Sequence, residues 1–154
     1  MKTTVPQSKP RRAPLAEEAA YIDLARTAEI LSRPIAQLLK TEDVSPAQYN
    51  VLRILRGSRE GLTCREIGER MITRDPDITR LLDRLEKREL ISRQRDDKDR
   101  RVVLTRITEA GLEVLARLDQ PVRNLHQSLL GHLGAHRLQA LAQLLQACRS
   151  RLDH

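Results

Sequence analysis

The chain has 154 residues, which suffices for one domain of ordinary size and excludes two large domains. Hydrophobic residues make up 40% of the chain, leucine alone fills 25 positions, and Phe and Trp are absent, so the core must be aliphatic, as in packed helices. The net charge of +7 is concentrated in residues 53–106, which carry 16 basic and 11 acidic side chains. An arginine-rich basic segment attracts nucleic acid, whereas the interspersed acidic residues make an acidic lipid surface a weaker candidate.

No apolar run approaches the roughly 20 residues that span a bilayer, and the N-terminal residues do not form an apolar signal segment. We therefore expect a soluble, cytoplasmic protein. Cys64 and Cys148 are too few for a disulfide-built scaffold, in agreement with a reducing compartment. Residues 1–14 contain three prolines and four cations, which predicts a disordered basic arm.

Apolar residues in the segment 15–43 recur at spacings of 4, 3, 4 and 3, which predicts a helix with a coiled-coil-like stripe. These residues are Leu24, Ala28, Leu31, Ile35 and Leu38. Pro34 interrupts the stripe. Because proline lacks a backbone donor and clashes with the preceding turn, we expect a kink or an early end near Ser32.

Three helix starts follow in close succession, and two of them carry capping boxes, in which two side chains bond each other's backbone N–H groups. These boxes are Ser45 with Gln48 and Thr63 with Glu66. We expect the first helix to end at Gly57 and the second near Met71. Thr73 or Asp75 then caps a third helix, with Pro76 in its first turn. The apolar stripe that buries one side of this helix consists of Ile78, Leu81, Leu82 and Leu85.

The pattern changes after Leu90, where ISRQR, the polar run DDKDR and RVVLTRI place β-branched, alternating residues on both sides of a charged turn. This pattern predicts a two-stranded hairpin. Helix, tight turn, helix and charged hairpin is the order of elements in a winged helix-turn-helix. In that fold the second helix enters the DNA major groove, and the hairpin, or wing, reaches the flanking minor groove.

Helical signals resume at Thr108, and the rest of the chain carries two further stripes at coiled-coil spacing. The first comprises Leu115, Leu118, Val122, Leu125 and Leu129, and the second Leu138, Leu141, Leu145, Cys148 and Leu152. We expect a bend at Pro121 and a break at Gly131 and Gly134. The predicted fold class is mainly α with a small β-hairpin, a winged helix-turn-helix with long N- and C-terminal helices.

Outward-facing cations mark the expected DNA contacts on the second helix and the wing. The residues that we assign to DNA binding are Arg74, Asp77, Thr79, Arg80, Arg84, Arg95, Lys98, Asp99, Arg100 and Arg101. Arginine forks suit phosphate and guanine, and a hydroxyl or carboxylate can contact other base edges. The alternative is a solvated helix whose charges pair with one another, such as Arg80 with Asp83.

The stretch from Leu62 to Gly111 resembles the DNA-binding core of the MarR family of bacterial transcription regulators. The family's wing signature, Asp-x-Arg followed seven residues later by Thr, falls on Asp99, Arg101 and Thr108. The upstream segment SPAQYNVLRIL resembles the helix that leads into the motif. Together these features cover residues 44–111, whereas the outer helices match only in length and apolar spacing.

The resemblance implies an obligate homodimer, built by the first and last helices, that binds a pseudo-palindromic operator. Members of the family are usually repressors, and a small-molecule effector or thiol oxidation releases them from the DNA. The expected organisation is a basic arm (1–14), an N-terminal dimerisation helix (15–43), a DNA-binding lobe (44–108) and C-terminal dimerisation helices (109–154). The dimerisation residues would be Leu24, Leu31, Ile35, Leu125, Leu129, Leu138, Leu141 and Leu145.

The wing signature also has a physical interpretation. An arginine that enters a narrow, negative minor groove must be aimed, and Asp99 can hold the guanidinium of Arg101 by a bidentate bond. The other wing cations would contact phosphates, and Thr108 would cap the following helix. The alternative is a hairpin that is braced by an Asp99–Arg101 pair and contacts nothing else.

Two departures from the family pattern concern the second helix. Glu89 stands where the family commonly has Gly, and a left-handed cap there would cost a non-glycine residue roughly 1 kcal/mol unless the helix ends differently. Asp75 and Asp77 place carboxylates at the groove-facing start of the helix, where they suit the helix dipole but repel phosphate. This acidic start weakens the case for base contacts by the first turn.

Sensor and enzyme chemistry have weaker support. Cys64 opens a short helix, whose dipole favours a reactive thiolate, but Cys148 suits a core position in its stripe and leaves no resolving partner. His132 and His136 have the spacing of zinc ligands, with His126 near in sequence, but neighbouring glycines disfavour an intact helix. No phosphate loop, nucleophile elbow or paired metal-ligand motif is present, so we expect neither an enzyme nor a cofactor.

Two hypotheses of different classes therefore remain. The first is a dimeric regulator that binds double-stranded DNA, with a small-molecule effector between its DNA-binding and dimerisation parts. The second is a winged-helix protein-interaction module that uses its leucine stripes. They differ in their response to salt, because phosphate binding weakens steeply as salt rises whereas apolar association does not.

Overall fold

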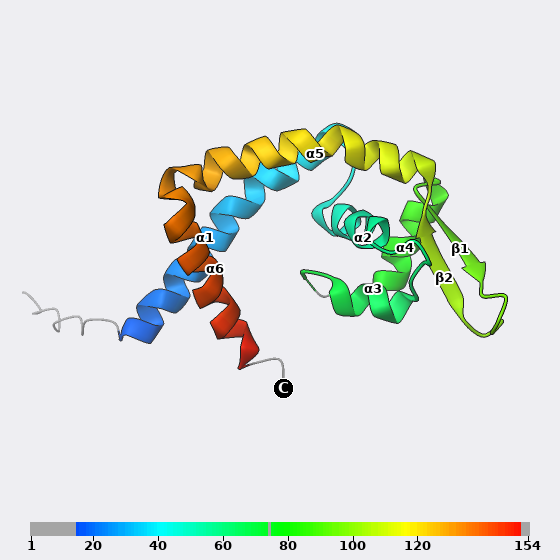
Figure 1. Ribbon diagram of the computed structural model, residues 1–154, viewed down its shortest axis with the longest axis horizontal. Coiled ribbons are helices and arrows are strands. Elements are labelled where there is room, and N and C mark those ends of the chain that lie inside the picture. Colours follow the sequence, from blue (N-terminus) through cyan, green and yellow to red (C-terminus); the bar gives the residue numbers. More distant parts are fainter. Residues whose placement is uncertain (1–14, 74, 152–154) are drawn as a thin grey trace, which may run out of the picture. The chain divides into compact units, whose positions relative to one another are not determined.

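The computed structural model describes residues 15–73 and 75–151. The predicted basic arm, Arg74 and Leu152 therefore lie outside the described residues. The chain forms two compact units, of which the first ends at Ser32 and the second begins at Arg33. Helix α1 (Ala16–Leu39) contributes to both units, and the second unit contains all the later elements labelled in Figure 1.

Helix α1 continues past Pro34 to Leu39, so of the two alternatives expected at Pro34, a kink or an early end near Ser32, the early end is wrong. Proline removes one backbone hydrogen bond, but the turns that follow it are held by packing. Leu39 is fully buried, and Ile35 packs against the core of the second unit. A single turn of 3-10 helix (Lys40–Glu42) completes the segment.

Three short helices and a hairpin form the winged helix-turn-helix, so the predicted fold class is confirmed (Figure 1). They are α2 (Pro46–Arg56), α3 (Cys64–Arg70), α4 (Ile78–Lys87), β1 (Ile91–Arg95) and β2 (Val103–Ile107). Both predicted capping boxes are formed, and α2 ends at Gly57 as expected. The strands pair antiparallel, with Ile91 opposite Ile107 and Arg95 opposite Val103.

The core of this lobe is aliphatic, as the composition predicts. Leu81, Leu82 and Leu85 of α4 are all buried, which confirms the predicted apolar stripe of the second helix. Burying a leucine completely contributes about 1.5–3 kcal/mol before the entropy cost of folding. The largest fully buried apolar side chains are Leu39, Leu52, Leu55, Ile67, Leu82, Leu85, Ile91, Leu115, Leu118 and Val51.

The hairpin is also joined to the loop before α3. The N–H and the carbonyl of Leu62 bond the carbonyl and the N–H of Thr105, at 3.0 and 2.8 Å. Thr105 is 1% exposed, so this pairing is shielded from water. The helix-turn-helix and the base of the wing therefore share one hydrogen-bonded edge.

The C-terminal part consists of α5 (Glu109–Leu130), a 3-10 turn (Gly131–Leu133) and α6 (Gly134–Ser150), which confirms the predicted break at the two glycines. Pro121 lies inside α5. Helix α6 buries none of its residues, so the expectation that Cys148 fills the core is wrong for the single chain, where this thiol is exposed. Within the described ranges, no helix has the length and apolar character needed to cross a membrane.

Candidate nucleic-acid interface

Helix α4 begins at Ile78, two to four residues later than the sequence predicts. Its N-cap is Asp77, whose side chain accepts a hydrogen bond from the Arg80 N–H at 3.3 Å. Asp75 instead accepts from the N–H of Asp77 at 2.9 Å, and Pro76 precedes the helix. The prediction of a Thr73 or Asp75 cap is therefore wrong. Asp77 stands at the N-terminus of the helix, where the positive end of the helix dipole favours a carboxylate. Capping therefore explains one of the two acidic residues at this helix start.

The outer face of α4 presents Thr79, Arg80 and Arg84 to solvent. The Nε of Arg80 lies 3.2 Å from a carboxylate oxygen of Asp77. Arg84 forms no ion pair within residues 15–73 and 75–151. The expected alternative pairing of Arg80 with Asp83 is not formed, because Asp83 bonds Arg93 of β1. Arg80 is therefore paired locally, with Asp77 in place of Asp83, and Arg84 is an outward cation of α4 that stays unpaired in the described ranges.

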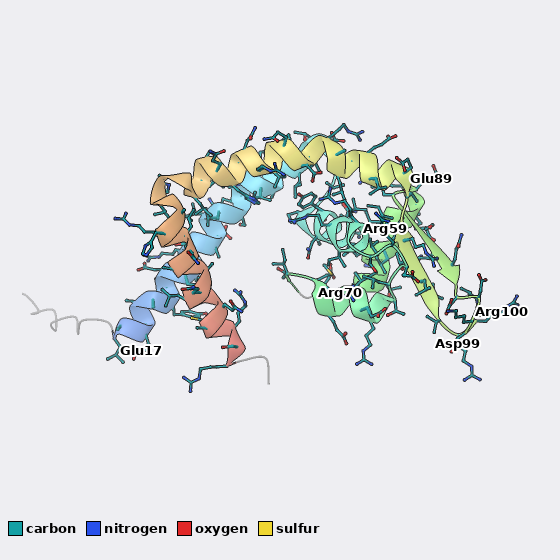
Figure 2. The ribbon with its side chains drawn as sticks, viewed as in Figure 1. Glu17, Arg59, Arg70, Glu89, Asp99 and Arg100 are labelled. Atoms are coloured by element: carbon teal, nitrogen blue, oxygen red, sulfur yellow. The ribbon has the colours of Figure 1, made fainter. Side chains whose placement is uncertain are left out.

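The wing turn presents Lys98, Asp99, Arg100 and Arg101 to solvent, and Figure 2 shows the connection between the two strands with Asp99 and Arg100 at its tip. The carboxylate of Asp99 accepts a hydrogen bond from the backbone N–H of Arg101 at 3.0 Å. The expected bond to the Arg101 guanidinium is absent from the described part of the chain. Asp99 thus shapes the turn and leaves the guanidinium of Arg101 available to a ligand.

Arg95 supports the same turn from strand β1. One of its guanidinium nitrogens donates to the Arg100 carbonyl at 3.1 Å. The N–H of Asp96 bonds the Val102 carbonyl at 2.9 Å, and so closes the loop. Arg95 is exposed and retains further donors, so it braces the wing and remains one of its outward cations.

The end of α4 shows the strain that the sequence suggests. Glu89 adopts the left-handed conformation, with a φ of 58°, at the position where the family commonly has Gly. The helix therefore ends in the expected left-handed cap although no glycine is present. Thr108 caps α5 as predicted, because its hydroxyl accepts from the Gly111 N–H at 3.2 Å.

Two features of this lobe escape sequence reasoning. Arg93 bonds both Asp83 and Glu86, which ties β1 to α4. The side chain of Asn50 accepts from the N–H of Ile72 at 2.8 Å, which ties the turn of the helix-turn-helix to α2. Both depend on contacts between elements distant in sequence, and no local motif signals them.

A polar cleft of about 240 Å³ lies between α2 and α5. Its lining is Tyr49, Arg53, Arg56, Asp119, Val122, Arg123 and His126. Burial raises the pKa of the Tyr49 hydroxyl, so this group stays protonated. The hydrogen bond to Asp119, at 2.7 Å, raises the pKa of Arg56 and keeps it charged. Two further arginines give the cleft an excess of positive charge.

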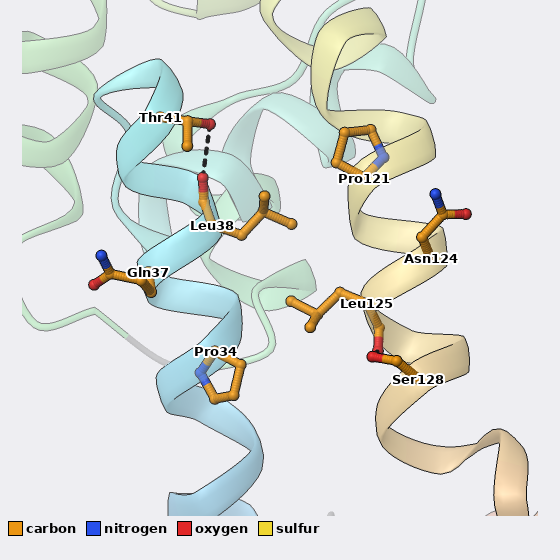
Figure 3. Close-up of a pocket in the computed structure, with 8 residues that line it drawn as sticks. All are labelled: Pro34, Gln37, Leu38, Thr41, Pro121, Asn124, Leu125 and Ser128. Carbon is orange, nitrogen blue, oxygen red and sulfur yellow. Dashed lines mark hydrogen bonds between the residues drawn. The ribbon is translucent and has the colours of Figure 1, made fainter.

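An apolar groove of about 670 Å³ lies between the C-terminal part of α1 and the middle of α5. Figure 3 shows the side chains of Leu38 and Leu125 pointing toward each other across it. Pro34 and Pro121 lie on opposite walls. Leu125, which the sequence assigns to dimerisation, is thus half-buried in its own chain.

The thiols and histidines do not form a site in the part of the chain that the structure describes. Both cysteines are free, and Cys64 packs partly against the core of the lobe. No group of three or more His, Cys, Asp or Glu side chains is arranged to hold a metal ion among these residues. The basic face of α4 and the wing is therefore the strongest candidate site.

Comparison with known proteins agrees with this geometry. The family model described as "MarR family" matches residues 44–103. A MarR transcription factor from Planctomyces limnophilus is 39% identical, with 89% of this chain and 99% of that chain covered and a TM-score of 0.66. The HTH-type transcriptional repressor IacR from Pseudomonas putida is 28% identical over 137 residues, which span 89% of this chain and 81% of IacR.

A third relative is similar in structure and is bound to DNA. A mutant of MarR from E. coli, solved in complex with operator DNA, has 26% identity and a TM-score of 0.76. The match covers 88% of this chain and 99% of the E. coli chain. The first two relatives are a transcription factor and a transcriptional repressor by name, which is a non-enzymatic kind of function.

Proposed function

Because this chain belongs to the MarR family of transcription regulators, whose winged-helix fold binds DNA, we propose that it acts at the nucleoid as a homodimeric repressor. Its target is a pseudo-palindromic operator. The observation that carries this proposal is the exposure of Arg80 and Arg84 on α4 together with Arg100 and Arg101 on the wing, all within one lobe. Helix α4 then enters the major groove and the wing enters the flanking minor groove.

Repression is the direction that the relative from Pseudomonas putida has by name. Binding of a repressor at or beside a promoter requires a stable register on the duplex. Two lobes that contact half-sites about 34–36 Å apart supply this register, and a palindromic operator matches the twofold symmetry of the dimer.

Exposed leucines on the outer helices support the homodimer. Leu24 of α1 is 46% exposed and Leu141 of α6 is 39% exposed, although both occupy apolar stripes at coiled-coil spacing. The groove beside Leu125 adds a further apolar surface. A second copy of the chain would cover these apolar surfaces and remove them from water. Burial of apolar surface is the largest favourable contribution to the free energy of most protein–protein association.

The polar cleft between α2 and α5 supports release by a small-molecule effector. Arg53, Arg56 and Arg123 surround it with a single carboxylate, Asp119, and the ring of Tyr49 supplies an apolar wall. An organic acid of modest size fits this combination of charge and apolar surface. It would release the operator by binding more tightly to the lobe spacing that does not match the half-sites.

Selection of bound duplexes from a random pool, followed by affinity measurements at several salt concentrations, tests the proposal. We expect a twofold-symmetric site, and Arg101→Ala should weaken its binding at least tenfold while the dimer mass stays unchanged. A matched control is Arg117→Met, which removes an exposed arginine on α5 that pairs with Glu42 at 2.9 Å. If the chain selects no sequence, or binds through a contact that is insensitive to salt, the protein-interaction alternative is correct instead.

The effector is tested by adding a panel of small organic carboxylates to the protein–operator complex. We expect release by a subset of these acids and loss of the response in Arg123→Ala. Release that is unchanged in this variant would show that the effector binds elsewhere.

A further inference from the structure

Strand β1 is tied to helix α4 by a cluster of three charged side chains, Arg93, Asp83 and Glu86. The Nε and one terminal nitrogen of Arg93 donate to one oxygen of Glu86 at 2.9 and 2.6 Å. The same terminal nitrogen also donates to Asp83. The backbone N–H of Arg93 donates to the other oxygen of Glu86 at 3.2 Å. Side chain and backbone of one residue thus hold two successive turns of α4.

This cluster differs from an ordinary surface ion pair. A single exposed pair contributes little, because two long side chains lose entropy and solvent screens the charge. Here the Arg93 side chain is only 25% exposed. Arg93 also forms four hydrogen bonds, so the entropy lost in ordering this one residue is offset by several interactions. The hydrogen bonds from Arg93 lower the pKa of Glu86, which shows that the carboxylate is held in its charged form.

The cluster lies between the two elements that we propose bind DNA, helix α4 and the wing. On α4, Asp83 and Glu86 lie beside Arg84, which faces solvent. On the hairpin, Arg93 precedes Arg95, which bonds the turn that carries Arg100. The cluster therefore lies between the groove-facing helix and the wing tip, at the root of the hairpin.

The two grooves of a duplex have a fixed separation, so a helix in one groove and a wing in the next must be held at a matching distance. Loose attachment would require the ordering of the wing at every binding event, at a cost in affinity. The single positive charge of Arg93 also offsets one of the two negative charges of Asp83 and Glu86, which reduces their repulsion of nearby phosphates.

We propose that Arg93 is a positioning residue that sets the wing against α4, so that both enter the DNA at once. This inference rests on the proposed function. Arg93 acts through Asp83 and Glu86 and does not itself contact DNA, because its fork is occupied by these carboxylates.

The test is a double-mutant cycle in the full chain on the operator obtained by selection. Arg93→Met keeps an apolar stem and removes the fork. We expect it to lower operator affinity at least tenfold, and we expect the tenfold loss caused by Arg101→Ala to shrink to about twofold in the Arg93→Met background, because the wing is already misplaced. The slope of affinity against salt should also become shallower, because a misplaced wing loses the phosphate contacts of its own cations.

Folding is checked by thermal unfolding and dimer mass. If Arg93→Met does not fold, the variant with Asp83→Asn and Glu86→Gln opens the same cluster from the helix side and should show the same loss of the Arg101 effect. Arg117→Met serves as the matched control and should keep its affinity within about twofold, with a full Arg101 effect.

Two results would overturn the inference. Equal losses from Arg101→Ala in both backgrounds would show that Arg93 does not position the wing. A full Arg101 effect in the Arg93→Met background, together with a salt slope lowered by about one phosphate contact, would show that Arg93 binds DNA directly. A wild-type chain that selects no operator would contradict the proposed function itself, which is a separate outcome.

Discussion

The hydroxyl of Thr108 donates a hydrogen bond of 2.6 Å to the backbone carbonyl of Glu89. Because the same hydroxyl caps α5, one side chain connects the end of α4 to the start of α5 across the root of the hairpin. The backbone N–H of Thr108 adds a bond of 3.1 Å to the Leu90 carbonyl. The threonine of the wing signature therefore fixes the point where α4, the wing and α5 converge.

Replacing Thr108 should reveal this double role. Thr108→Val keeps the shape but removes both the cap and the donor to Glu89, and we expect a loss of about 1–3 kcal/mol in the free energy of unfolding. Thr108→Ser retains the hydroxyl and should lose much less. Urea unfolding at a fixed protein concentration measures both variants, and equal losses would show that the hydroxyl contributes nothing.

Glycine at position 89 should stabilise the chain. The left-handed φ of Glu89 is strained for any residue with a Cβ atom, and glycine removes this strain, although it gains more freedom in the unfolded state. We expect Glu89→Gly to raise the free energy of unfolding by about 0.5–1 kcal/mol. Glu89→Ala keeps the Cβ atom and is the control. A gain in the alanine variant as large as that in the glycine variant would contradict the strain argument.

Gly111 should tolerate no side chain. A Cβ atom there would lie 2.3 Å from the Leu90 carbonyl oxygen and 2.7 Å from the side chain of Ile107. The first of these contacts is with backbone, which cannot move aside without shifting the hairpin. We expect Gly111→Ala to destabilise the chain by at least about 2 kcal/mol in urea unfolding.

The control for this substitution is Gly68→Ala, at a helical position of α3. Its Cβ atom would lie 3.4 Å from the end of the Ile78 side chain, close to ordinary contact. Since alanine is the better helix former, we expect no loss and a gain of up to about 1 kcal/mol. Equal destabilisation at both positions would show that loss of glycine, and not the close approach at Gly111, is responsible.

The stability contributed by the Arg93 cluster should depend on pH. Hydrogen bonds from Arg93 lower the pKa of Glu86 from its ordinary value of 4.5, so this contribution is present above about pH 4.5 and is lost as the pH falls further. The difference in free energy of unfolding between wild type and Glu86→Gln should therefore shrink below about pH 4.5. Glu113→Gln, on the solvent side of α5, is the control. A difference that stays constant from about pH 7 to about pH 3 would exclude this linkage.

The elements that the sequence predicts well are those whose signals are local. Ser45 with Gln48 and Thr63 with Glu66 complete their capping boxes within four residues, so helix starts follow from the sequence alone. The hairpin is also predicted from the sequence alone, because β-branched, alternating residues lie on both sides of a charged turn. The start of α4 is not, since Thr73, Asp75 and Asp77 are all competent caps within five positions and packing decides among them.

Sequence reasoning misses contacts between distant elements, and within a turn it misplaces the atoms that meet. Asp83 has a plausible partner one turn away in Arg80, yet it bonds Arg93 after the chain has reversed direction. Asp99 is correctly placed in the wing turn, but it bonds the backbone of Arg101 and not the guanidinium. A spacing can indicate that two residues are neighbours, but it does not determine which atoms of them meet.

The paired backbone bonds between Leu62 and Thr105 have a consequence for regulation. This pairing holds β2 to the loop before α3, whereas the Arg93 cluster holds β1 to α4. If a signal moves the wing, we therefore expect the β-ribbon and the loop before α3 to move together, because separating them would break both of the water-shielded bonds between Leu62 and Thr105.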